Sequence, residues 1–245
     1  MAKIGLISDL HANIEALDAV LAVLDGEKCD RLVCLGDVVG YGASPRQCLK
    51  KVRELRIPTV KGNHDDYVAD IFGVLGAHLR PEIREAIAWT QSQLDFDEAG
   101  WLGNLPMQLD FEGFSVIHSS FASNHWSYCL DEQTFAANFA KQTKQLVFCG
   151  HSHRPLVGMN VPGEPVPFVD YVREDPLPAD YPVMVNIGSV GQPRDHDPRA
   201  CCAVYDTESR VCRLLRVEYD IAAAQQKILA AGLPKRFAER LAAGC

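Results

Sequence analysis

The sequence predicts an α/β domain in which strands and helices alternate through the first half of the chain. Three successive segments start with a short apolar run that leads through a polar loop to a helical pattern, and this repetition predicts parallel strands with helical crossovers. The second half changes period, because short apolar runs separated by turn residues favour antiparallel strands. With 245 residues and a 47% hydrophobic composition, the chain can bury one large core, so we expect a single domain over residues 1–245.

Composition excludes several classes of protein. A formal net charge of −8 and a pI near 5.5 argue against a broad basic face, so we expect no stable nucleic acid complex. The apolar run at the start is too short for a signal peptide and none later reaches membrane-spanning length, which predicts a soluble, cytoplasmic protein without a membrane partner. Nine cysteines without a C-x-x-C pair are expected to be reduced, mostly as small core residues. Homo-oligomerisation stays open.

Each element of the first half follows from its apolar spacing and its end signals. Residues 3–8 are almost wholly apolar, as in a central strand buried on both faces. Asn13 can cap the following helix, whose apolar residues recur at helical spacing up to Gly26. Further strands are expected at 31–35 and 57–60, a helix that begins with Pro at 45–55, and a helical excursion over 67–94.

The second half is expected to begin with a hairpin. Residues 107–111 and 114–118 flank Glu112 and Gly113, which suit a tight turn. A short helix is expected at 131–140, a strand at 145–149, and one or two closing helices over 220–241. The segment 162–182 is a candidate mobile loop or long hairpin. The remaining strands are expected to be antiparallel, at 156–161, 166–170, 182–186, 200–205 and 211–219.

Polar side chains with metal-binding capacity stand at the predicted strand ends. Asp37 follows an apolar run and Gly36. Taken alone, it would indicate a turn or a helix cap. It is one of eight such residues, and parallel strands bring their carboxyl ends to one edge of a sheet. Five of these eight residues are histidines, and the chain contains eight histidines in all. The set consists of Asp9, His11, Asp37, Asn63, His64, His118, His151 and His153.

The mixture of imidazole and carboxylate ligands indicates a transition metal. Nitrogen and oxygen donors together suit manganese, iron, zinc, nickel or cobalt, whereas calcium and magnesium prefer oxygen alone. Seven candidate ligands exceed what one tetrahedral ion needs, and a carboxylate can bridge two ions about 3.5–4 Å apart. We therefore expect two divalent ions. Mn2+ is the preferred metal, and Fe, Zn, Ni or Co are the alternatives.

Five sequence blocks resemble, in order and character, the motifs of the calcineurin-like metallophosphoesterase superfamily. A sixth segment, 186–195, resembles its bacterial and archaeal branch of small phosphodiesterases. The resemblance implies a four-layer αββα sandwich of two mixed sheets flanked by helices, compatible with the predicted parallel first half and antiparallel second half. The five blocks are Asp9-Leu10-His11, Gly36-Asp37-Val38-Val39-Gly40, Gly62-Asn63-His64-Asp65, His118, and Gly150-His151-Ser152-His153.

The resemblance also implies roles for individual residues. Asp37 would bridge two ions, the first held with Asp9, His11 and His153, and the second with Asn63, His118 and His151. His64 would approach the phosphoryl oxygen or the leaving group, and Asp65 or Asp66 would orient it.

The implied activity is hydrolysis of a small phosphorylated substrate, a phosphodiester or alternatively a phosphomonoester, by in-line attack of a hydroxide that bridges the metals. Asp37 and His64 are the expected catalytic residues, and protonation of the leaving group by His64 would contribute about 10² to 10⁴ in rate. Asn63 and Arg194 are expected to contact substrate, although Arg194 also reads as a surface turn residue. His125 and Trp126 could stack on a leaving group or belong to the core.

Other activities stay open. Within the superfamily the alternatives are a protein serine/threonine phosphatase, a dinucleoside polyphosphate hydrolase and a scaffold without catalysis. Scaffolds tend to lose metal ligands, whereas this sequence contains all seven candidate ligands. The chain departs from common relatives at His118-Ser119-Ser120 and at His196, which leaves the substrate pocket and the substrate itself undefined.

Overall fold

The computed structural model describes residues 2–121, 126–166, 168–170 and 175–245. The strands are β1 Lys3–Ile7, β2 Arg31–Cys34, β3 Gln108–Asp110, β4 Phe114–Ile117, β5 Leu146–Cys149, β6 Leu156–Met159, β7 Phe168–Asp170, β8 Val183–Asn186, β9 Ala200–Asp206 and β10 Cys212–Val217. The helices are α1 Ile14–Gly26, α2 Pro45–Glu54, α3 Asn63–Ala69, α4 Pro81–Gln93, α5 Phe96–Gly103, α6 Glu132–Phe139, α7 Ile221–Ala230 and α8 Lys235–Ala243.

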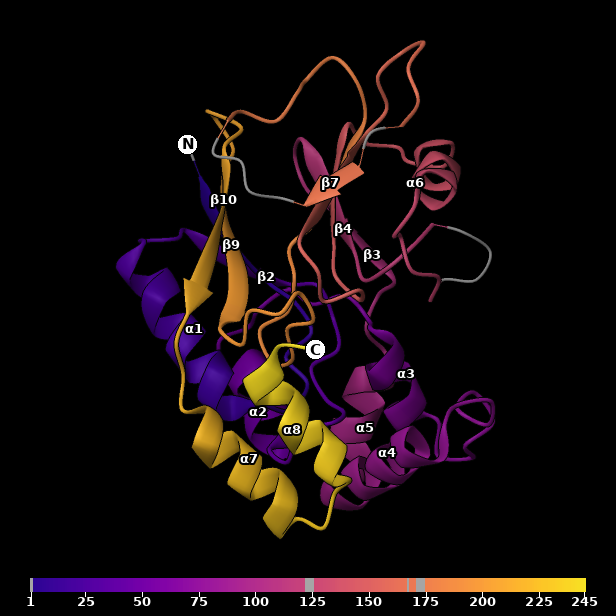
Figure 1. Ribbon diagram of the computed structural model, residues 1–245, viewed down its shortest axis with the longest axis vertical. Helices are drawn as coiled ribbons and strands as arrows, with labels where there is room; N and C mark the ends of the chain where they lie inside the picture. The colour runs from indigo at the N-terminus through magenta and orange to yellow at the C-terminus, as the bar shows by residue number, and fades with distance from the viewer. Residues whose placement is uncertain (1, 122–125, 167, 171–174) are drawn as a thin grey trace.

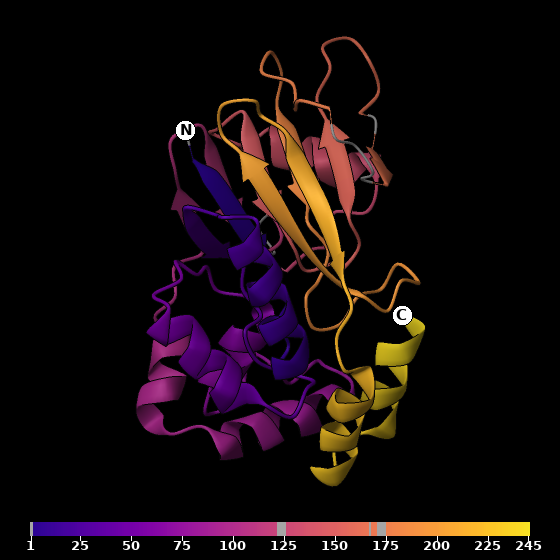
Figure 2. The same cartoon turned by 90° about the vertical axis from the view of Figure 1, so that its left-hand side faces the viewer.

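Two mixed sheets pack face to face between helices, as the predicted αββα sandwich requires. One sheet has the order β10-β9-β1-β2 and the other β3-β4-β5-β8-β6-β7. Helix α1 covers the outer face of the first sheet and α6 flanks the second, while the remaining helices gather at one end (Figure 1). The view turned by 90° shows β9 and β10 beside β1, with α7 and α8 below them (Figure 2).

Alternation along β1 shows how the layers are held together. Ile4 and Leu6 face the core between the sheets, where they join Phe114 and Phe148 of the second sheet. Ile7 faces the opposite way, into the core shared with α1. Because every face of β1 meets another apolar layer, its end can place polar residues deep inside the protein.

Two strand predictions were wrong in detail. Residues 57–60 form no strand, since the segment joins the sheet through one bridge between Thr59 and Cys34. Strand β8 is not purely antiparallel, because it pairs in parallel with β5 as well as antiparallel with β6. Strand β9 brings the two halves of the chain together in one sheet, because it pairs with β1. Long-range pairing of this kind carries no local sequence signal.

Local predictions were confirmed where end signals were strong. The side chain of Asn13 accepts a hydrogen bond from the backbone of Ala16 and caps α1, and Pro45 opens α2. The predicted hairpin is β3 and β4. All nine cysteines are free, and most of them are buried. In the described ranges no helix has the length and apolar character needed to cross a membrane.

Candidate metal centre

The loops at the strand ends have an unusual backbone. Five of the seven predicted ligands have a positive φ, between 45° and 67°. L-residues adopt this left-handed region rarely, and such strain concentrates at functional sites where the surrounding fold enforces it. Backbone hydrogen bonds tie the loops together, for example from Asp9 to Gly36 and from His11 to Asp37. The five are Asp9, His11, Asp37, His151 and His153.

One cluster unites the end of β1 with the loop after β5. The Nε2 atom of His153 lies 3.2 Å from Oδ1 of Asp9 and 3.1 Å from Nε2 of His11. All three side chains are almost completely buried. The structure therefore brings together three of the four side chains predicted for one ion, and the candidate ligand atoms lie within 4.8 Å of one another.

A second cluster forms around Asp37. Its Oδ2 atom lies 3.4 Å from Nε2 of His118, which is also 3.2 Å from Oδ1 of Asn63. His151 completes this cluster beside His118. The same Oδ2 atom lies 3.5 Å from Nε2 of His11 in the first cluster. One carboxylate oxygen thus stands between the two groups, as a bridging ligand must.

Hydrogen bonds on the far side of each ring fix which nitrogen faces the centre. Carbonyl oxygens only accept, so the ring atom next to a carbonyl carries the hydrogen: Nδ1 of His11 donates to Val39, Nδ1 of His153 donates to Gln192, and Nδ1 of His118 donates to Leu35. The Nε2 atom of His151 likewise donates to the carbonyl of Trp126. Backbone partners of this kind orient metal-ligating histidines.

The remaining ring nitrogens face other acceptor atoms. The Nε2 atoms of His11 and His153 lie 3.1 Å apart, and Nε2 of His118 faces the oxygens of Asp37 and Asn63. Buried acceptors opposite acceptors are unfavourable unless a proton or a cation lies between them. The donor set, its burial and its orientation therefore fit metal ions.

Electrostatics favour ionised carboxylates, neutral imidazoles at His64 and His151, and a protonated His118. Burial lowers the pKa of His64 to about 4 and that of His151 to about 3. Burial opposes ionisation of Asp37, but the charge of His118 outweighs it and holds the pKa of this carboxyl well below its usual range. Burial likewise opposes protonation of His118, yet Asp37 raises the pKa of that imidazole to about 9. The negative centre attracts positive charge, which a metal would supply.

His64 lies beside both clusters at the start of α3. Its backbone N–H donates to Oδ1 of Asp37 at 2.8 Å, and its ring packs 4.3 Å from that of Tyr41, centroid to centroid. The Nδ1 atom is buried and has no hydrogen-bond partner among the described residues. The ring also lines a cleft of about 290 Å³ that opens onto the clusters.

Gly40 allows His64 to take this position. A Cβ atom at Gly40 would lie 2.4 Å from Nδ1 of His64, and the φ of Gly40 is +92°. We expect Gly40→Ala to displace the imidazole and lower kcat on the order of 10²-fold, the usual cost of a displacement near 1 Å. Gly113→Ala is the matched control, because Gly113 has φ +87° and no neighbour within 4 Å. Steady-state kinetics give kcat for both variants. Because both share the backbone strain, the difference between their kcat values measures the effect of the contact with His64.

If the two variants lose activity equally, the contact between residue 40 and His64 does not matter for turnover. Both should lose stability by about 1–2 kcal/mol, because both place an L-residue in the left-handed region.

The expectation that Asp65 or Asp66 orients the His64 ring was wrong. The carboxylate of Asp65 accepts backbone N–H groups of Asp37, Val38, Val39 and Gly62. Asp66 pairs instead with Lys61. Asp65 therefore shapes the loop that carries Asp37, a role that only the folded backbone reveals.

Other supporting residues were missed as well. Ser8 donates to Asp9 at 2.6 Å, and Ser189 donates to the backbone carbonyl of the same residue. The amide of Asn186 donates to the carbonyl of Gly150 and to Ser152, which holds the loop of His151. Burial of a polar side chain beside a motif is the signal that could have indicated them, and it needs the fold.

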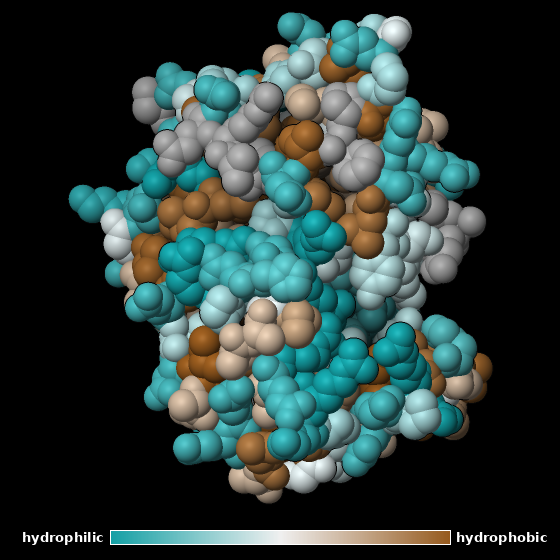
Figure 3. Space-filling model, viewed as in Figure 1, coloured by the Kyte–Doolittle hydropathy of each residue, from teal (hydrophilic) through white to brown (hydrophobic). Residues whose placement is uncertain are grey.

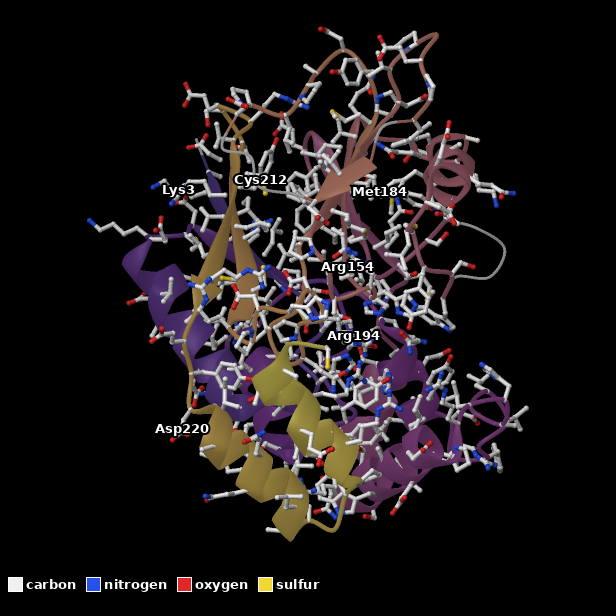
Figure 4. The ribbon with its side chains drawn as sticks, viewed as in Figure 1. Lys3, Arg154, Met184, Arg194, Cys212 and Asp220 are labelled. Carbon is white, nitrogen blue, oxygen red and sulfur yellow. The ribbon has the colours of Figure 1, made fainter. Side chains whose placement is uncertain are left out.

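The remaining predicted residues surround the cleft. Arg194 lies between the strand-end loops and the helices beneath them (Figure 4), and it lines the cleft together with Trp126. The ring of Trp126 is half-buried and 5.9 Å from His118. His196 is exposed and does not line the cleft. His125 lies outside the described residues.

The family follows from comparison with known proteins. The domain pattern of the calcineurin-like phosphoesterase superfamily matches residues 2–210. This chain belongs to that superfamily. An uncharacterized protein of Methanocaldococcus jannaschii is 35% identical over 253 residues, covering 99% of this chain and 98% of its own. The crystal structure of a metallophosphoesterase from Sphaerobacter thermophilus is 36% identical with a TM-score of 0.87, covering 100% and 99% of the two chains.

A more distant relative is a symmetrical bis(5'-nucleosyl)-tetraphosphatase of Actinobacillus pleuropneumoniae. It is 26% identical over 152 residues, which are 60% of this chain and 53% of that protein. Membership of this metal-dependent superfamily makes the chain a hydrolase of phosphoric esters.

Proposed function

We propose that this phosphoesterase hydrolyses phosphodiesters with two divalent transition-metal ions, Mn2+ first among them. Asp9, His11, Asp37 and His153 hold one ion. Asp37, Asn63, His118 and His151 hold the other. The observation that carries the proposal is the pair of buried clusters with Oδ2 of Asp37 between them, 3.5 Å from Nε2 of His11 and 3.4 Å from Nε2 of His118.

The bound ions would lower the pKa of water and withdraw charge from the phosphoryl oxygens, which is the chemistry that ester hydrolysis needs. The protein supplies orientation, because each histidine is fixed by a backbone carbonyl on its outer side. His64 lines the cleft and donates a hydrogen bond to the leaving oxygen. Arg194 holds a phosphoryl oxygen of the substrate through its guanidinium.

The shape of the cleft favours a diester over a monoester. The cleft at the metal clusters shares Tyr41, Ile83, Tyr128 and Arg194 with a second cleft of about 340 Å³. A phosphodiester has two organic substituents, and the joined clefts give the second one a place. A hydrolase of dinucleoside polyphosphates is the second candidate, favoured by the distant tetraphosphatase relative.

A panel of esters tests this proposal. The metal-free protein, reconstituted with Mn2+, Fe2+, Zn2+, Ni2+ or Co2+, is assayed on bis(p-nitrophenyl) phosphate, p-nitrophenyl phosphate and diadenosine tetraphosphate. We expect metal-dependent turnover with a higher kcat/KM for the diester than for the monoester. A preference for the monoester would contradict the diester assignment, and a lack of turnover with every metal would contradict the proposed function as a whole.

A further inference from the structure

The second cleft is lined by four arginines. It lies between the start of α4, the helix α8 and the residues Tyr41 and Tyr128, beside the cleft of the metal clusters. In the space-filling view this face of the molecule is hollowed and largely hydrophilic above α8 (Figure 3). Glu82 is the one acidic residue among the lining residues. The arginines are Arg80, Arg194, Arg236 and Arg240.

These four arginines gather in one cleft without a carboxylate partner in the described ranges. Six arginines elsewhere in the described part of the chain pair with carboxylates within 4.0 Å, as Arg46 does with Glu98 and Arg199 with Asp197. None of the four cleft arginines has such an ion pair within the described residues. The protein as a whole has a net charge of −8. The four arginines, which have no ion-paired carboxylate in the part of the chain that the structure describes, therefore make this cleft locally positive.

Two of the arginines are held in place by hydrogen bonds that leave other N–H groups of their guanidiniums unused within the described residues. Nη2 of Arg194 donates to Gln192 at 2.9 Å, and its guanidinium carbon lies 5.7 Å from the ring centroid of Tyr41. Its Nε is buried without a hydrogen-bond partner among the described residues. Nε of Arg240 donates to the carbonyl of Cys245, which anchors one edge of the guanidinium. Fixed guanidinium forks of this kind match the oxygens of a phosphate.

The arginines also act on one another. Burial, together with the charges of Arg194 and Arg236, lowers the pKa of Arg240 to about 10. Mutual repulsion of this kind is relieved when an anion enters the cleft. Such a ligand would meet apolar walls from Ile83 and Phe237 as well as the cations.

We propose that the substrate carries a second phosphate group, which binds in the arginine cleft while the ester phosphate binds at the metal clusters. This inference rests on the proposed function and narrows its substrate class to phosphoric esters with two separate phosphate groups. Arg194 lines both clefts and marks where they join. Arg236 and Arg240 of α8 then serve as specificity residues for the second phosphate.

A matched pair of substrates tests the proposal. Thymidine 5'-(p-nitrophenyl phosphate) and its 3'-phosphorylated counterpart share the diester and the leaving group, and differ only in the second phosphate. Hydrogen bonds between a guanidinium and a phosphate are charged at both ends and therefore strong, so we expect wild-type kcat/KM to favour the two-phosphate ester on the order of tenfold or more. Arg236→Glu and Arg240→Gln should each reduce that preference on the order of tenfold.

Arg84→Glu is the control for charge, because Arg84 is exposed on α4 and does not line the cleft. It should change the preference by less than about twofold, since screening weakens distant surface charges. Thermal unfolding of each variant verifies folding, and Arg236 is exposed, so its replacement spares the core.

Three outcomes would overturn the proposal. The first is equal turnover of the two esters by the wild type, and the second is a preference that Arg236→Glu leaves unchanged. The third is stimulation of the one-phosphate ester by added sulfate without any preference for the two-phosphate ester, which would assign the arginines to a separate anion. No turnover of either ester with any of the five metals would overturn the proposed function, and this inference with it.

Discussion

Replacing Asp37 with asparagine is expected to lower kcat on the order of 10³-fold and to reduce bound metal from two ions toward one or none. The expectation follows from the position of Oδ2, which lies within 3.5 Å of His11 in one cluster and His118 in the other. Loss of a ligand shared by two ions removes several kcal/mol of charge stabilisation from the reaction. Metal analysis and steady-state kinetics on the purified variant measure both effects.

The Asp37→Asn variant should still fold, because an asparagine oxygen can accept the hydrogen bond that Oδ1 receives from the backbone of His64. Circular dichroism and thermal unfolding verify this. Asp18→Asn is the control, since Asp18 is exposed on α1 and pairs with Lys51. Near-normal activity and two bound ions in Asp37→Asn would show that this carboxylate does not bridge the metals.

His64→Ala is expected to keep two metal ions and to lose about 10² to 10⁴ in kcat, the range that a positioned proton donor usually contributes. His64 lines the cleft, and its ring lies 4.9 Å from that of His11, centroid to centroid. The distinguishing measurement is metal content, because removal of a ligand would lower both metal content and activity.

His196→Ala provides the matched control. His196 is exposed, does not line the metal cleft and has a left-handed φ of 67°. It should retain activity within about twofold, as surface changes away from special features usually do. If His64→Ala loses an ion, His64 is a ligand, a role compatible with its place in a group with His11 and Asp37.

Sequence reasoning reached the fold where local signals were strong. Asn13 and Pro45 mark helix starts by mechanisms that act within one turn, and the structure has both helices. It failed where strands pair across long stretches of chain. The parallel pairing of β5 with β8 depends on packing between residues about 37 apart, and the apolar run at 57–60 is limited to one bridge.

The candidate metal ligands could be predicted because their residue types are rare together and strand ends converge in space. The structure brings all seven into two clusters. The role of Asp65 in shaping the loop of Asp37 could not be predicted in this way. The four backbone N–H groups that donate to its carboxylate come together only in the folded protein. The arginine cleft was also missed, because Arg80, which precedes α4, and Arg240 of α8 are far apart in the sequence and meet only in the folded protein.

The most direct test of the central claim is anomalous X-ray scattering from crystals of the protein reconstituted with Mn2+. We predict two manganese peaks, one on each side of Asp37, with Asp9, His11 and His153 around the first and Asn63, His118 and His151 around the second. A single peak, or two peaks that do not share Asp37, would contradict the dinuclear centre proposed for this phosphoesterase.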